Sequence, residues 1–194
     1  MELKREVQEN QKNTYADYAT WDDGQRWEII NGLPIMMSPA PTAAHQRLSF
    51  EITMRLGGFL AGNPCQVYVA PFDVRFEDYE KTDTVVQPDV MVICDKSKIK
   101  KNGCVGAPDV VFEILSPSSA KMDLLKKYNL YEKHGVREYW ALDPEDKMLV
   151  RFSLKDGRFE RSNAEQGRLE SLALPGFALD VQELFAVLDD TPAE

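Results

Sequence analysis

Two apolar segments near the middle of the chain limit the fold more than any other feature of the sequence. They are residues 84–94, TVVQPDVMVIC, and residues 109–115, DVVFEIL. β-branched and other large apolar residues dominate both segments, which predicts strands buried in the centre of a sheet. Pro88 interrupts the first segment. Because proline cannot donate to a strand ladder, that strand must be distorted, bulged or at an edge there.

The remaining patterns alternate between strands and helices. Residues 26–37 predict a hairpin, because Asn31-Gly32 is a strong turn signal between two apolar runs. Over 42–60, apolar residues recur every three or four positions, which predicts a helix. The other predicted elements are strands at 66–76 and 137–143, a helix at 119–134 that stops at Gly135, a hairpin of 147–154 with 158–162, and a helix at 180–188. This order predicts an α/β fold in which helices flank a mixed sheet, with extra hairpins.

Bulk properties indicate one globular domain. The chain has 194 residues, of which 43% are apolar and 28% are charged, and we expect a polar tail at 1–14 followed by a single domain at 15–188. No apolar run reaches the length of about 18 residues that suggests a transmembrane helix. The polar N-terminus also lacks the apolar centre of a signal peptide, so we expect a cytoplasmic protein with no membrane contact. Cys65, Cys94 and Cys104 form no C-x-x-C or Cys/His pattern, and we expect reduced thiols, mostly in the core.

Asp89 and Glu113 are carboxylates within the two apolar segments. A buried, unpaired carboxylate is strongly unfavourable, and two neighbouring carboxylates repel each other and raise at least one pKa. A divalent cation removes both penalties. Mg²⁺ suits such a pair because it binds one or two carboxylates and keeps several waters, and Mn²⁺ is an alternative ion. Asp89 could instead start a turn, and Glu113 could pair with an arginine or a lysine.

The segment after Glu113 contains further candidates. Ser118 or Ser119 could cap the following helix, whose free N–H groups would offer a phosphate seat beside the carboxylates. A plain strand-to-helix turn explains these serines equally well. Asp123 and Lys127 are four residues apart on the same helix. Spacing alone favours a surface ion pair over a Lys127 that points at a metal-bound water.

Two residues near the N-terminus are weaker candidates. His45 lies in the first turn of the first long predicted helix, where an imidazole could act as a base, a ligand or a simple hydrogen-bonding group. Glu28 is a charge between apolar neighbours in the first hairpin. Strand alternation could place Glu28 on the solvent face, so its position alone decides little.

Four motifs follow one another along the chain, in this order: WEIINGLPIMMSPAPTAAHQRL, VVQPDVMVI, VVFEILSPSS and DLLKKYNLYEKHGVREYWALDP. Through these motifs the chain resembles the Uma-type restriction endonuclease family over residues 15–185. The resemblance implies the PD-(D/E)XK nuclease fold, a mixed sheet flanked by helices with metal ligands on its central strands.

Carried over to this sequence, Pro88-Asp89 matches the PD element and Glu113 matches the (D/E) position. The usual lysine two residues later is absent, because position 115 is Leu. The resemblance implies that Lys127, four residues before Tyr131, supplies it in place of the neighbouring Lys121 or Lys126. Glu28 and His45 fall within family motifs as partners of the metal or of water, and Ser116 and Ser118 match the Ser-Pro-Ser turn, where they would contact a substrate phosphate.

We therefore expect a Mg²⁺-dependent endonuclease that hydrolyses DNA, acting as a homodimer because a duplex has two strands and twofold symmetry is the commonest. Its catalytic residues would be Asp89, Glu113, Lys127, His45 and Glu28. Nucleic-acid-binding proteins usually have a basic face, and the net charge of −9 gives no sign of one in this chain. This charge and the missing lysine favour the alternative, a weakly active or inactive nuclease-fold protein that acts as a nucleic-acid-binding or regulatory module.

Overall fold

Two six-stranded sheets form the framework of the protein. The structure is a computed structural model that describes residues 12–37, 40–77, 82–115 and 120–189. The first sheet, called sheet A, has the order β2-β1-β5-β4-β8-β7, and the second, sheet B, has the order β12-β11-β10-β9-β6-β3. Both are mixed, since β4–β8 and β9–β10 are parallel pairs and the other pairs are antiparallel. The predicted fold class is confirmed.

The elements have the following bounds. Sheet A contains β1 (Trp27–Ile30), β2 (Leu33–Met36), β4 (Val74–Arg75), β5 (Val85–Val86), β7 (Ile99–Lys100) and β8 (Gly103–Val105). Sheet B contains β3 (Gln66–Val69), β6 (Val90–Ile93), β9 (Val110–Ile114), β10 (Glu138–Asp143), β11 (Met148–Lys155) and β12 (Arg158–Ala164). A small third sheet pairs β13 (Arg168–Glu170) with β14 (Ala178–Asp180). The helices are α1 (Tyr15–Tyr18), α2 (Ala43–Phe59), α3 (Ala120–His134) and α4 (Val181–Phe185), with 3₁₀ turns η1 (Lys96–Lys98) and η2 (Ala186–Leu188).

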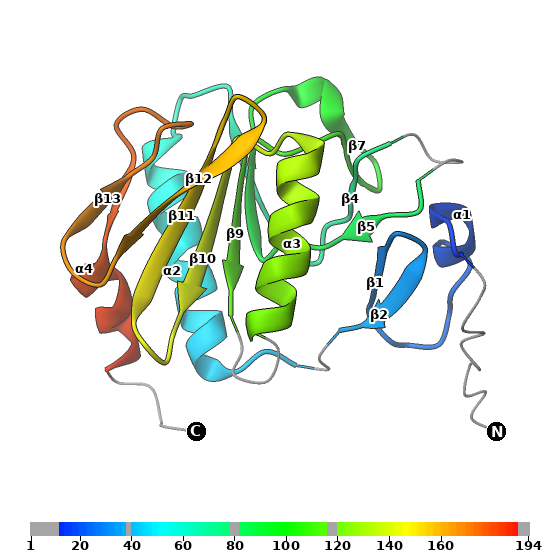
Figure 1. Cartoon of the computed structure of the whole chain (residues 1–194), viewed down its shortest axis with the longest axis horizontal. Helices are drawn as coiled ribbons and strands as arrows, with labels where there is room; N and C mark the ends of the chain where they lie inside the picture. The colour runs from blue at the N-terminus through cyan, green and yellow to red at the C-terminus, as the bar shows by residue number, and fades with distance from the viewer. Residues whose placement is uncertain (1–11, 38–39, 78–81, 116–119, 190–194) are drawn as a thin grey trace.

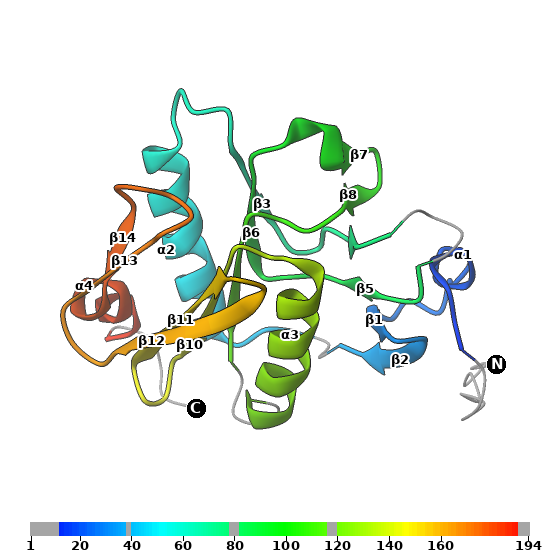
Figure 2. The ribbon, with the colours of Figure 1, turned by 45° about the horizontal axis from the view of Figure 1, so that its top comes forward.

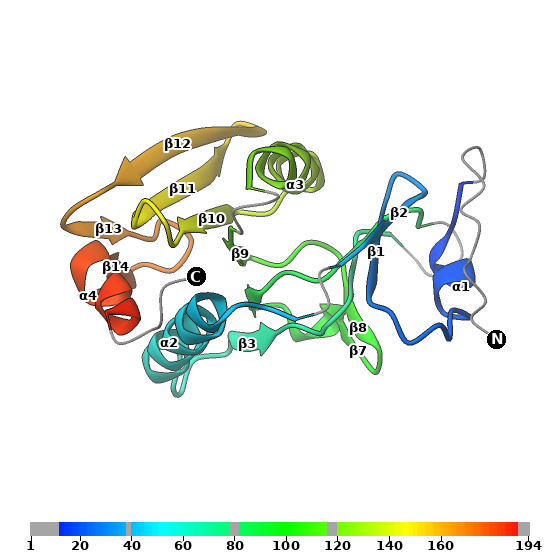
Figure 3. The same ribbon diagram turned by 90° about the horizontal axis from the view of Figure 1, so that it is seen from below.

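Helices α2 and α3 cover opposite faces of sheet B (Figures 1 and 3). Alternate residues of the central strands divide between two cores, as strand geometry requires. Val90, Val92 and Phe112 join the core beneath α2 and α4, whereas Met91 and Val111 join the core that contains α3. Odd-numbered residues of β6 and β9 therefore face α3. Among the described residues, no helix has the length and apolar character that a membrane span needs.

The chain passes directly from one sheet to the other at two proline-containing links. The segments 66–76 and 84–94, each predicted as one strand, are each two short strands in different sheets, namely β3 with β4 and β5 with β6. The first link contains the cis peptide bond Ala70–Pro71, and the second is Gln87-Pro88-Asp89. Proline supplies no N–H for a ladder, so pairing ends at these points. The distortion predicted at Pro88 is confirmed as a change of sheet, visible beside α3 in Figure 2.

Most of the other predicted elements are present. The first hairpin turns at Asn31 and Gly32, which both have positive φ angles of 53° and 82° as a two-residue hairpin turn requires. The two long helices and the β11–β12 hairpin also lie where they were expected, within about two residues of the predicted ends. Six short elements of the described residues were not predicted: α1, β7, β8, β13, β14 and the 3₁₀ turn η1.

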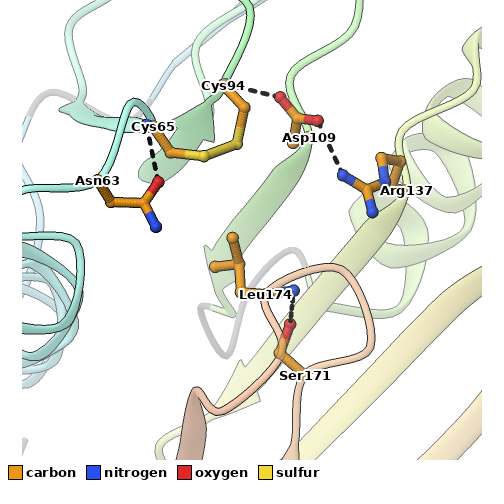
Figure 4. The surroundings of a disulfide bond; sticks show 7 residues. All are labelled: Asn63, Cys65, Cys94, Asp109, Arg137, Ser171 and Leu174. Carbon is orange, nitrogen blue, oxygen red and sulfur yellow. Dashed lines mark hydrogen bonds and ion pairs between the residues drawn. A yellow bond between two sulfur atoms is a disulfide. The ribbon is translucent and has the colours of Figure 1, made fainter.

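A disulfide joins Cys65 and Cys94, so the expectation of reduced thiols is wrong for these two residues. Strands β3 and β6 are antiparallel with Gln66 opposite Ile93, which places the two cysteines opposite each other just beyond the ladder. The bond lies near Asp109, which accepts a hydrogen bond from the Cys94 N–H (Figure 4). Sequence spacing could not reveal the pair, because the two cysteines meet only through strand register. Cys104 is free and buried, and burial raises the pKa of its thiol to about 11.

Glu138 is a fully buried carboxylate at the start of β10. Its two oxygens accept hydrogen bonds from five groups on β10, on β11 and on the loop before β14. These donors are Trp140 Nε1, Ser153 Oγ, Ser171 Oγ, Leu172 N and Ala173 N. Glu138 therefore fastens the C-terminal part of the chain to sheet B.

Glu138→Ala should lower the free energy of unfolding by at least about 3 kcal/mol, because several buried donors lose their acceptor and each unmet donor costs about 1–3 kcal/mol. Urea denaturation followed by circular dichroism measures the loss. Glu160→Ala is the matched control, since its carboxylate is exposed and pairs with Lys155 at the surface. Similar midpoints for the two variants would contradict the assigned role of Glu138.

Candidate functional site

Asp89 and Glu113 lie opposite each other on sheet B. Val90 pairs with Phe112 in the antiparallel β6–β9 ladder, so the next step of the register places Asp89 across from Glu113. Asp89 Oδ2 accepts a hydrogen bond of 2.8 Å from the backbone N–H of Ile114. Directly opposed residues of an antiparallel pair project from the same face, and here that face is the one toward α3.

Lys127 brings a positive charge to these carboxylates from α3. Its Nζ atom lies 2.9 Å from Glu113 Oε1 and 3.3 Å from Glu28 Oε1. Glu28 belongs to β1 of sheet A, and its side chain is buried. The solvent-face alternative for Glu28 and the surface ion pair considered for Lys127 are therefore both wrong. One ammonium group connects the two sheets.

Tyr131 lies one helical turn after Lys127 and contacts the same carboxylate. Its hydroxyl donates a 2.6 Å hydrogen bond to Glu113 Oε1, the atom that also accepts from Lys127. The tyrosine is fully buried. Two donors thus hold one oxygen of Glu113 and fix the orientation of the carboxylate.

His45 approaches Asp89 from the N-terminal end of α2. Thr42 caps this helix, with its Oγ1 accepting from the backbone N–H of His45. The His45 Nε2 atom lies 3.1 Å from Asp89 Oδ1. Within the described part of the chain, the buried Nδ1 atom of His45 has no hydrogen-bond partner.

Burial and neighbouring charges shift the pKa values of this group. Burial raises the pKa of Glu113 to about 7, with the Lys127 charge opposing the rise and the Asp89 and Glu28 charges adding to it. Burial disfavours a charged Lys127, but the three surrounding carboxylates outweigh this and raise its pKa well above the ordinary value. Lys127 therefore stays charged, and Glu113 changes its protonation near neutral pH.

The same balance acts on the two outer members. Burial lowers the pKa of His45. The hydrogen bond to Asp89 and the negative charge of Asp89 together outweigh this effect, so the net shift of the His45 pKa is upward. Burial and then the charge of Glu113 raise the pKa of Tyr131 well above its ordinary value. Tyr131 is therefore a permanent hydrogen-bond donor at neutral pH.

The five residues predicted as catalytic come together: Asp89, Glu113, Lys127, His45 and Glu28. Ser116 and Ser118 lie outside the described residues, as does the side chain of Lys121, while Lys126 is exposed. Two members of the group were not predicted, Tyr131 and Gln87, whose backbone N–H donates to Glu28 Oε1 at 2.9 Å. The four-residue spacing from Lys127 could have indicated Tyr131, but Gln87 acts through its backbone and leaves no sequence pattern.

The carboxylates of Asp89 and Glu113 suit a hard cation that takes few ligands from the protein. In the described ranges, no three His, Cys, Asp or Glu side chains are arranged to hold a metal ion by themselves. Mg²⁺ needs no such set, because it often takes one or two carboxylates and keeps water in its other positions. Asp89 and Glu113 supply two carboxylates on one face of the sheet, so the residues present fit a partly hydrated Mg²⁺.

Comparison with solved structures defines the class of fold. A crystal structure described as a "putative nuclease" from Anabaena variabilis matches with a TM-score of 0.75 and 19% sequence identity, covering 91% of this chain and 99% of that one. This chain therefore has the same fold as that protein. The Uma2 family, described as "Putative restriction endonuclease", matches residues 15–182, and this chain belongs to that family.

Two curated relatives match a smaller share of this chain than the Anabaena structure does. Uncharacterized protein sll1609 of Synechocystis is 29% identical over 135 residues, which are 67% of this chain and 74% of that protein. Uncharacterized protein slr1290 of the same organism is 25% identical over 128 residues, which are 65% of each chain.

Lys127→Met should destabilise the protein by about 3–5 kcal/mol at pH 8, because it leaves Glu28 and Glu113 buried without their positive partner. The loss should shrink at pH 5, because this pH is below the Glu113 pKa of about 7 and protonation neutralises that carboxylate. Urea unfolding at the two pH values measures both effects. Lys126→Met, an exposed change one residue away, serves as the control, and an equally small loss in both variants would contradict the buried ion-pair bridge.

Proposed function

We propose that this protein is a Mg²⁺-dependent endonuclease that hydrolyses phosphodiester bonds in DNA, with Mn²⁺ able to replace Mg²⁺. The observation that carries the proposal is the 2.9 Å distance from Lys127 Nζ to Glu113 Oε1. Glu113 itself lies opposite Asp89 on the neighbouring strand. A lysine from helix α3 thereby reaches the pair of carboxylates, where nucleases of this type have a lysine two residues after the acid. The missing lysine at position 115 then ceases to be an objection.

Each side chain has a separate part in the proposed chemistry. Mg²⁺ held by Asp89 and Glu113 would polarise the scissile phosphate and lower the pKa of the attacking water. Lys127 orients that water and offsets negative charge that develops on the phosphate. Glu28 keeps the ammonium group of Lys127 in place, and His45 steadies Asp89 through its Oδ1 atom.

DNA is the proposed substrate in spite of the acidic chain. A divalent cation and Lys127 provide positive charge at the point of cleavage, so binding does not need an extended basic face. Low overall affinity for the phosphate backbone is then expected, with weak dependence on salt, because few phosphates would be neutralised by the protein. We further propose a homodimer, which would present two sites to the two strands of a duplex.

Plasmid DNA should be nicked by the wild-type protein in the presence of Mg²⁺ or Mn²⁺, and Asp89→Ala should lose at least about 100-fold of this activity, since it removes a metal ligand. Agarose gels of supercoiled plasmid measure the conversion. Asp146→Ala is the control, because this aspartate is exposed on the β10–β11 turn. Cleavage that survives Asp89→Ala would come from a contaminant or another site and would refute the assignment.

A different outcome would favour the second candidate function. If the folded wild-type protein neither cleaves DNA nor binds Mn²⁺ in calorimetry, the Lys127 bridge is a structural ion pair. The protein would then be a nuclease-fold module for nucleic-acid binding or regulation. The satisfied pairing of Lys127 with two carboxylates is the observation that keeps this alternative open.

Mn²⁺ affinity should rise with pH and level off above about pH 7. A carboxylate must lose its proton to bind a cation, and folded Glu113 loses its proton near its pKa of about 7 and not near 4.5. Below this value the affinity should fall by about tenfold for each pH unit. Calorimetric titration with Mn²⁺ from about pH 5.5 to 8.5 tests the slope. Glu113→Gln should bind more weakly with a flatter profile, and a flat wild-type profile would contradict the role of Glu113.

A further inference from the structure

A second polar cluster lies beside the candidate site and is joined to it through one residue. We call it the Gln87 cluster; it consists of Tyr18, Arg26, Asp73 and Gln87. The Gln87 Oε1 atom accepts a 2.7 Å hydrogen bond from Arg26 Nη2. The Gln87 Nε2 atom donates to Asp73 Oδ1 at 2.9 Å and to the Tyr18 hydroxyl at 3.1 Å. The Gln87 side chain is buried, and both its Oε1 and its Nε2 atoms make hydrogen bonds within the cluster.

The backbone of Gln87 serves a different group from its side chain. Its N–H donates to Glu28 Oε1 at 2.9 Å, the same oxygen that lies 3.3 Å from Lys127 Nζ. Gln87 also begins the three-residue link that leaves sheet A and ends at Asp89. One residue therefore anchors a partner of Lys127 and the start of the segment that carries an expected metal ligand.

The anchor of Gln87 comes from several separate parts of the chain. Tyr18 ends α1, Arg26 precedes β1, and Asp73 lies in the link between β3 and β4. The Gln87 side chain and the hydrogen bond from the Tyr18 hydroxyl to Asp73 Oδ1 join these parts. A shift of the Gln87 backbone would move Glu28 and Asp89 in relation to Glu113, which belongs to the other sheet.

We propose that Gln87 is a positioning residue: its clamped side chain holds Glu28 and Asp89 in the geometry that cation binding at the site requires. This inference rests on the proposed function, because it assumes that Asp89 and Glu113 bind a divalent cation. Groups behind metal ligands commonly change metal affinity by about 10–100-fold when they are removed. The alternative is that the cluster only fastens α1 to the domain.

Gln87→Met provides the test, since it removes all three side-chain hydrogen bonds and keeps the side-chain length and the backbone N–H. We expect Mn²⁺ affinity to fall by about tenfold in calorimetry. Thr84→Val is the matched control three residues earlier in the chain. It removes the hydrogen bond that the Thr84 hydroxyl accepts from the Asn31 N–H and the one that it donates to Asp83. It should lower the melting temperature and leave the Mn²⁺ affinity unchanged. Tyr18→Phe removes the hydrogen bond that the Tyr18 hydroxyl accepts from Gln87 and the one that it donates to Asp73, and it replaces Gln87→Met if that variant does not fold.

A double-mutant cycle separates positioning from plain stabilisation. If Gln87 acts through Glu28, then Gln87→Met should weaken Mn²⁺ binding much less in a Glu28→Gln background than in the wild type. Equal Mn²⁺ affinities for Gln87→Met and wild type would overturn this inference alone. Additive losses in the cycle would overturn the route through Glu28. No Mn²⁺ binding by the wild type would instead refute the proposed function, and this inference with it.

Discussion

The ammonium group of Lys127 lies between carboxylates that belong to different sheets. Glu28 comes from sheet A and Glu113 from sheet B, while Lys127 itself is carried by α3. An ion pair in the interior tolerates little displacement, because each charge loses its water and must recover that energy from its partners. The packing of Leu130 and Tyr131 in the core beneath α3 fixes the helix that delivers the lysine. The geometry of the site therefore depends on how the two sheets are placed relative to each other.

The two proline-containing links make this placement possible. A single long strand at 84–94 would keep all of its residues in one sheet. Ending the ladder at Pro88 instead lets the chain leave sheet A at Val86 and enter sheet B at Val90. Asp89 then stands at the junction, opposite Glu113 and within reach of His45 from α2. The residue that breaks the strand is therefore the reason that groups from both sheets and both helices can meet.

Sequence periodicity was sufficient for the parts of the fold that depend on local geometry. The turn at Asn31-Gly32 and the two long helices follow from backbone preference and from apolar spacing, which act over a few residues. Alternation also shows which residues share a strand face, but it cannot show what lies opposite that face. For this reason alternation alone leaves the surroundings of Glu28 open, and the position of β1 in sheet A, beside Lys127, decides them. The Cys65–Cys94 bond was missed for the same reason, since register between distant strands brings the two residues together.

The charges of the site do not balance, and this bears on why they are buried. Glu28, Asp89 and Glu113 are three carboxylates, and the largely buried ammonium group of Lys127 contacts two of them, Glu28 and Glu113. Proteins can usually replace buried ion pairs by apolar residues with no loss of stability, so stability alone does not explain this group. Burial raises the pKa of Glu113 to about 7, and the negative charges of Asp89 and Glu28 add to the rise. A divalent cation would remove the surplus of negative charge, and strongly shifted groups that are gathered in one place are typical of functional sites. The overall acidity of the chain and the local need for a cation are then compatible, because the substrate would meet the bound cation and not the surface as a whole.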